Sequence, residues 1–173
     1  MAGHTPKLDS KLKGRSKVKF ISHRGNVREI NPDRENTKKY IDEAIKLGYD
    51  VEIDIRTKDG ALYLGHDTAD EPVDIKWLAE RKDKLWLHIK DYDSLITFCD
   101  SNDNFKYFCH QSDDFTLVSN GLIWCHKVDN KMTDNCIIPL LSLEEVHGYN
   151  QYTFYGVCSD FVEQCKDKFE DKL

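Results

Sequence analysis

The stretch DVEIDIRTKDGALYLGHD, residues 50–67, predicts a strand, a tight turn and a returning strand. Its first half alternates apolar and charged side chains, which is the period-two pattern of a β-strand. The KDG sequence at 58–60 is a turn signal, and the shorter run at 61–66 then forms the second strand. A hairpin that served structure alone would need neither the carboxylates nor the histidine that this stretch carries.

Glu52 and Asp54 place two carboxylates on one face of the predicted strand, because residues two apart point the same way. Buried carboxylates without a partner are costly, and a divalent cation that prefers oxygen ligands, such as Mg²⁺ or Ca²⁺, is a natural partner. If the turn forms a three-residue loop, His66 falls opposite Glu52 on the same face. A histidine there can act as an acid or a base near neutral pH.

The run VKFISH at 18–23 predicts a buried strand that leads into HRGN. His23 is a second histidine, Arg24 can hold a phosphate in a bidentate fork, and Gly25 lets backbone approach a ligand closely. Two histidines, an arginine and a carboxylate-held metal suit displacement at a phosphodiester. One histidine removes a proton from the attacking group, and the other protonates the leaving alkoxide.

The rest of the chain alternates strand-like runs with short helical stretches. A helix is predicted from Asn36 to Leu47 and is ended by Gly48, and further helices are predicted at 91–101 and 161–171. Residues 68–84 have no clear pattern. The remaining strand-like runs are 85–90, 105–110, 121–128, 135–141 and 152–160. This alternation predicts an α/β fold with a parallel sheet.

Several predicted strands end in polar residues, which are His23, Asp54, Lys90, His110, His126 and Asp160. A (β/α) barrel places its chemistry at this end of its strands. The chain offers seven candidate parallel strands in 173 residues, whereas such barrels typically have about 250 residues. We therefore expect a minimal TIM-type barrel, shortened, with helices reduced to loops or with incomplete closure. The alternative to substrate contact for His110 and His126 is that they simply line the mouth of the barrel.

Composition places the chain among single-domain globular proteins. It is 39% hydrophobic, and its apolar runs are too short to cross a bilayer, so no transmembrane segment is expected. The net charge of −6 is spread along the chain, which argues against a nucleic-acid partner. Residues 1–16 are interpreted as a flexible leader without the apolar run of a secretory signal, and residues 17–173 as one barrel domain.

Six cysteines occur without a CxxC pair, mostly inside strand-like runs. This usage is typical of buried free thiols in a reducing compartment. Together with the lack of a secretory signal, it predicts a cytoplasmic location.

The order and spacing of these motifs resemble the glycerophosphodiester phosphodiesterase family. The matching motifs are His23-Arg24-Gly25, Glu35-Asn36-Thr37, Glu52-x-Asp54, Thr57-x-Asp59-Gly60 and His66-Asp67. The sequence GVCSDF at 156–161 also resembles the last strand of the family. The resemblance implies a TIM-type barrel, a divalent metal, and hydrolysis of a glycerophosphodiester of lipid metabolism to glycerol 3-phosphate and an alcohol.

The resemblance also implies roles in catalysis and phosphate binding. His23 and His66 would be the catalytic acid and base, and Arg24 a phosphate contact. Glu35 and Asn36 would orient the site. Lys90, in LHIK, matches the family's lysine on the third barrel strand and would also bind phosphate, with an ion pair to Glu52 or Asp54 as its alternative role.

Glu52 and Asp54 would be metal ligands, and His88 stands where the family has a third, glutamate ligand. The family implies Mg²⁺ or Ca²⁺. An imidazole ligand suits Mn²⁺ or Zn²⁺ better, so these metals stay open as well. The alternative for His88 is an interior histidine satisfied by hydrogen bonds.

Two functions follow from this pattern. The first is a metal-dependent phosphodiesterase acting on a small molecule. The second is a catalytically weak or inactive domain of the same fold that binds a phosphodiester or a metal. The pair of histidines favours the enzyme. The sequence leaves open the alcohol of the substrate, a hydrolytic or a cyclic-phosphate product, and the oligomeric state.

Overall fold

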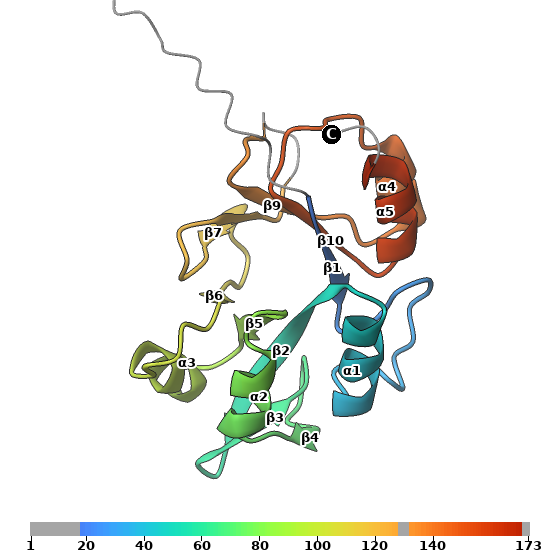
Figure 1. Cartoon of the computed structure of the whole chain (residues 1–173). Helices are drawn as coiled ribbons and strands as arrows, with labels where there is room; N and C mark the ends of the chain where they lie inside the picture. Colours follow the sequence, from blue (N-terminus) through green and yellow to red (C-terminus); the bar gives the residue numbers. More distant parts are fainter. Residues whose placement is uncertain (1–17, 128–131, 171–173) are drawn as a thin grey trace, which may run out of the picture.

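The structure, a computed structural model, describes residues 18–127 and 132–170. Within these ranges a ten-stranded mixed sheet curves round on itself, and the helices lie on its outside (Figure 1). The leader predicted at 1–16 lies outside the described residues. The observed class is α/β, with the sheet forming a partial TIM-like barrel.

Seven parallel strands form the main part of the sheet, in the spatial order β6-β5-β2-β1-β10-β9-β8. They are β1 (Lys19–His23), β2 (Asp50–Lys58), β5 (Leu85–Ile89), β6 (Tyr107–Cys109), β8 (Ile123–Cys125), β9 (Cys136–Pro139) and β10 (Gly156–Ser159). Each lies within or overlaps one of the seven strand-like runs predicted from the sequence. Their carboxyl ends therefore meet at one rim of the curved sheet.

Three further strands are antiparallel to their neighbours: β3 (Ala61–Leu64), β4 (Glu71–Pro72) and β7 (Phe115–Leu117). Strand β3 is the returning strand of the predicted hairpin. Strands β4 and β7 were not predicted. Among the described residues no strand ladder joins β6 to β8, the two ends of the parallel order. The rings of Phe108 and Trp124 stack between them with centroids 4.3 Å apart, so side chains replace the missing backbone pairing.

The described helices are α1 (Lys38–Lys46), α2 (Ile75–Arg81), α3 (Tyr92–Cys99), α4 (Leu143–Gly148) and α5 (Val162–Phe169). Helices α1, α3 and α5 match the predicted ones, and α2 lies in the unassigned stretch 68–84. Helix α1 begins after Thr37, whose side chain caps it, and Gly48 follows its end with φ +97°, which confirms Gly48 as the stop signal. Helix α4 has only six residues and was missed, although Ser142 and Glu145 form a capping box.

The two faces of the curved sheet have different cores. The outward face packs against the helices, with Val51, Ile53 and Ile55 of β2 in the larger apolar cluster. The inward face carries a smaller cluster that includes Trp86 and Trp124. Because side chains alternate along a strand, the polar positions of β2 point into the interior of the partial barrel.

The turn between β2 and β3 corrects one prediction. Lys58 pairs directly with Ala61, so the loop has two residues, Asp59 and Gly60, and not three. Both have positive φ, at 52° and 77°, as the tight hairpin turn favoured by Asp-Gly requires. Strand β3 ends at Leu64, and the register predicted to place His66 opposite Glu52 is wrong.

Gly65 shapes the chain just before His66. It has φ +147°, and a Cβ atom there would overlap the backbone oxygen of Thr68. We expect Gly65→Ala to lower the free energy of unfolding by about 2 kcal/mol or more. Gly60→Ala, which meets open space at φ +77°, is the control and should cost about 1 kcal/mol. Equal losses in urea denaturation would contradict this role of Gly65.

Candidate active site

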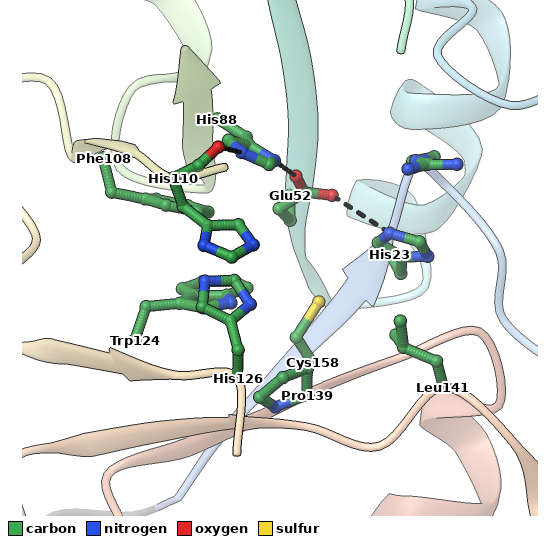
Figure 2. A pocket seen from close by; sticks show the side chains of 11 residues that line it. His23, Glu52, His88, Phe108, His110, Trp124, His126, Pro139, Leu141 and Cys158 are labelled. Carbon is green, nitrogen blue, oxygen red and sulfur yellow. Dashed lines mark hydrogen bonds and ion pairs between the residues drawn. The ribbon is translucent and has the colours of Figure 1, made fainter. Parts of the chain in front are cut away.

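The carboxyl ends of β1 and β5 and the first half of β2 bring a polar cluster together inside the rim of the partial barrel. His23 ends β1, Glu52 and Asp54 project from β2, and His88 projects from β5. Figure 2 shows His23, Glu52 and His88 turned toward one another. The register explains this convergence, because Glu52 lies beside His23 and Asp54 beside His88 on neighbouring strands.

Glu52, Asp54 and His88 form a candidate metal centre. Each offers one ligand atom, and these atoms lie within 4.8 Å of one another. All three residues are buried. Glu52 Oε2 and Asp54 Oδ1 accept no hydrogen bond from any described residue. Two adjacent buried carboxylates and one imidazole are a ligand set that fits a divalent cation.

In the metal-free protein, His88 supplies positive charge to the two carboxylates. Its Nδ1 lies 3.2 Å from Asp54 Oδ1 and 3.5 Å from Glu52 Oε1. Burial opposes the charged imidazole, but the two carboxylates outweigh it and raise the pKa of His88 to about 9. Burial likewise opposes ionisation of Asp54, yet contacts with His88 and Arg24 hold its pKa below the usual range.

Without metal, the contacts of His88 with the two carboxylates should make the unfolding free energy depend on pH. The pKa of His88 is about 9 in the folded protein against an ordinary value of 6.5. Its stabilisation is therefore fully present below pH 6.5 and is lost as pH rises through 9. In EDTA we expect the unfolding free energy to fall by about 3 kcal/mol over this interval.

Urea denaturation at a series of pH values tests this expectation. In His88→Gln most of this decrease in unfolding free energy should be absent, since glutamine carries no proton that titrates in this interval. A fall of the same size in His88→Gln would show that other groups cause it.

His23 is held by a buried hydrogen-bond network from the last strand. Its Nδ1 lies 2.8 Å from Asp160 Oδ1, and its Nε2 lies 3.8 Å from Glu52 Oε2. Asn26 Nδ2 donates to Asp160 and to Glu35, both at 2.7 Å. Burial alone would lower the pKa of His23, but Asp160 and Glu52 more than offset this and raise it. The imidazole is thus oriented by Asp160, with Nε2 toward the metal cluster.

Arg24, Glu35 and Asn36 surround Asp54. Arg24 Nε lies 2.9 Å from Asp54 Oδ2, and Arg24 Nη1 donates to Glu35 at 3.2 Å. Asn36 exchanges two hydrogen bonds with Asp54, through the backbone N–H and a carboxylate oxygen of Asp54. Arg24 and Asn36 have φ of 54° and 55°, in the left-handed region, which is uncommon for arginine and more readily adopted by asparagine.

His66 and Lys90 line a neighbouring, larger cavity of about 610 Å³. The His66 side chain is 39% exposed, and its Nδ1 lies 2.8 Å from Asp67. Its carbonyl oxygen accepts hydrogen bonds from Arg56. Lys90 Nζ lies 3.6 Å from Asp54 Oδ1, which matches the ion-pair alternative.

The smaller cavity, of about 160 Å³, is lined by His23, His110 and His126 among others. The two cavities share His88 and His110. His23 therefore lines one cavity and His66 the other, and His88 of the candidate metal centre lines both.

Sequence reasoning missed Asp160 and Asn26 as site residues. Both contact other predicted site residues, and Asp160 does so across 137 positions of sequence. The signal for Asp160 was its place at the end of the last strand-like run. Asn26 stands in HRGN, directly after the motif that carries His23 and Arg24.

The fold of this chain is similar to that of a solved structure. It is a glycerophosphoryl diester phosphodiesterase from Parabacteroides distasonis ATCC 8503, with a TM-score of 0.51 and 14% sequence identity over 87% of this chain and 86% of that one. At this identity the likeness shows a shared fold. No protein-family model and no curated protein matches the sequence. In the part of the chain that the structure describes, no helix is long and apolar enough to cross a membrane.

Proposed function

We propose that this protein is a metal-dependent phosphodiesterase that hydrolyses a glycerophosphodiester-type small molecule to glycerol 3-phosphate and an alcohol. The observation that carries the proposal is the convergence of His23 on the buried Glu52, Asp54 and His88 cluster at the strand ends of the partial barrel. The shared fold with a glycerophosphoryl diester phosphodiesterase supports it.

Glu52, Asp54 and His88 would hold a divalent ion in this proposal. Such an ion acts as a Lewis acid that neutralises charge on the phosphoryl oxygens. The mixed carboxylate and imidazole set suits Mg²⁺, Ca²⁺, Mn²⁺ or Zn²⁺. Arg24 forms ion pairs with Asp54 and Glu35. These two carboxylates would orient its guanidinium toward the phosphate.

His23 would transfer protons through Nε2, because Asp160 holds Nδ1 and supports the imidazolium form. His66 would serve the opposite side of the phosphorus from the larger cavity, with Nδ1 held by Asp67. In-line displacement needs an acid and a base on opposite sides of the phosphoryl group. Lys90 lines the same cavity as His66 and would be a phosphate contact.

Metal removal tests the role of the carboxylate cluster. We expect EDTA to abolish hydrolysis and added Mg²⁺ or Mn²⁺ to restore it. Glu52→Gln should lower kcat by about 10²-fold or more, because it removes charge from the metal centre. It should also weaken Mn²⁺ binding measured by electron paramagnetic resonance.

Glu144→Gln, at an exposed glutamate of α4, is the matched control and should leave both readouts unchanged. Unchanged Mn²⁺ affinity in Glu52→Gln would overturn the assignment of this carboxylate to the metal.

The alternative function is a binding domain with weak or no catalysis. The exposed position of His66, in a different cavity from His23, favours it. Calorimetry would then show binding of a phosphodiester with metal, while the diester stays intact over hours.

A further inference from the structure

Three lysines gather at the amino end of the partial barrel, the end opposite the candidate active site. Lys19 begins β1, Lys84 directly precedes β5, and Lys106 directly precedes β6. Asp50, the first residue of β2, lies among them, because β6, β5, β2 and β1 are neighbours in this order. The strand order thus brings three ammonium groups to one carboxylate.

Asp50 is buried, and the three cations surround its carboxylate. Lys84 Nζ lies 3.1 Å from Oδ1, while Lys106 Nζ and Lys19 Nζ lie 3.7 and 3.8 Å from Oδ2. Trp86 Nε1 also donates to Oδ2, at 3.2 Å. Among the described residues, no other carboxylate lies within 4 Å of these three ammonium groups. One lysine would balance Asp50, so the cluster holds positive charge in excess.

The most buried of the three lysines has structural contacts that the other two lack. The Lys106 side chain is 16% exposed, against 41% for Lys19 and for Lys84. The Lys106 ammonium donates to the backbone oxygen of Asp83 at 2.8 Å and lies 4.3 Å from the ring centroid of Trp86. Lys106 is therefore part of the interior, whereas Lys19 and Lys84 lie at the surface.

A cavity of about 310 Å³ adjoins these two surface lysines. Its charged lining residues are Lys19, Asp50, Lys84, Lys166 and Glu170. Lys166 and Glu170 form an ion pair at 3.8 Å, so they add little net charge. With the buried lysine behind Asp50, four ammonium groups stand against two carboxylates around this cavity. An anion therefore fits this cavity better than a cation does.

The excess of positive charge matches a phosphate group. A phosphate monoester carries a charge of about −1.5 to −2 near pH 7, and lysine binds phosphate as a compact point charge. Lys19 and Lys84 lie within 4 Å of the same carboxylate, so both can reach the oxygens of one small anion. The cavity has room for a phosphate group together with a small substituent.

We propose that Lys19 and Lys84 form a second ligand site, at the amino end of the barrel, that binds a phosphate dianion, either free or as the head of a small phosphate monoester. The buried pair of Asp50 and Lys106 holds the two lysines in place from behind. This cavity shares no lining residue with either cavity of the candidate active site. The site is thus independent of the proposed function.

Amide chemical shifts of the ¹⁵N-labelled protein test the site without turnover. Inorganic phosphate or propyl phosphate is added at pH 8 in EDTA, at constant ionic strength. Either anion should cause saturable shifts of the amides of Gly48, Asp50 and Lys84, and acetate, a monoanion, should bind more weakly. Tighter binding of propyl phosphate would assign the cavity to a monoester, and tighter binding of inorganic phosphate to the free ion.

Two kinds of variant should change the phosphate affinity in opposite directions. Lys19→Gln and Lys84→Gln should each weaken binding at least about fivefold, because each removes one charged contact. Asp50→Asn should strengthen binding several-fold, because the lysines lose their counter-charge. Lys76→Gln, at an exposed lysine of α2 outside this cavity, is the matched control and should keep the affinity of the unmodified protein.

Shifts confined to the surroundings of Arg24 and Lys90, or no saturable shifts, would overturn the proposal. So would an unchanged affinity in both lysine variants, or weaker binding in folded Asp50→Asn. If phosphate binds as expected but no diester is hydrolysed, the second site stands and the proposed function fails. If diesters are hydrolysed and these amides do not respond, the enzyme stands and the second site fails.

Discussion

His23→Ala is expected to lower kcat for phosphodiester hydrolysis by about 10²- to 10⁴-fold at neutral pH, the contribution of a positioned general acid or base. The physical reason is that His23 Nε2 lies at the metal cluster, 3.8 Å from Glu52, while Asp160 fixes the other nitrogen. Steady-state kinetics at saturating metal would measure the loss.

His147→Ala is the control for this variant, because His147 is exposed on α4 and belongs to neither cavity. It should keep full activity. A kcat within threefold of the unmodified protein for His23→Ala, with the fold intact, would remove His23 from the chemistry.

Asp54→Ala is expected to destabilise the protein by about 3–5 kcal/mol, because it leaves buried cations without their counter-charge. Asp54 is fully buried and lies within 4 Å of cationic groups of Arg24, His88 and Lys90. The variant also loses the hydrogen bond that Asn36 Nδ2 donates to the Asp54 carboxylate. Urea denaturation in EDTA at pH 7 would measure the change.

Asp42→Ala is the matched control for this effect. Asp42 pairs with Arg81 through two contacts at 2.6 and 3.2 Å, but its side chain is 45% exposed. Exposed ion pairs contribute about 0–1 kcal/mol, so the free energy of unfolding of this variant should change little. Similar losses in the two variants would mean that burial of Asp54 does not dominate its contribution.

The parallel strands were predictable because their apolar runs are local signals. All seven were found, and Gly48 correctly ended α1. Two short elements escaped prediction. Strand β7 has three residues, of which two are exposed, and α4 has six, too few for a helical period to be recognised. The two-residue hairpin loop was missed because Lys58 was counted as part of the turn, although Asp-Gly alone suffices for it.

The candidate metal centre was predictable only where its residues are close together in the sequence. Glu52 and Asp54 are two residues apart on one strand, so their common face follows from the sequence alone. Their meeting with His88 depends on the pairing of β2 with β5, which aligns Asp54 with His88. The contacts of His23 with Asp160, and of His110 with His126, join strand ends far apart in sequence, and no local pattern encodes them.

Phosphorus NMR of the purified protein with a panel of glycerophosphodiesters tests the central claim most directly. Samples would contain Mg²⁺, Ca²⁺ or Mn²⁺, with an EDTA sample and His23→Ala beside them. We predict that a phosphomonoester or cyclic phosphate signal grows only with metal and only when His23 is present. Diester signals that stay unchanged over hours with every metal, in protein that remains folded, would contradict the assignment of this protein as a phosphodiesterase of these substrates.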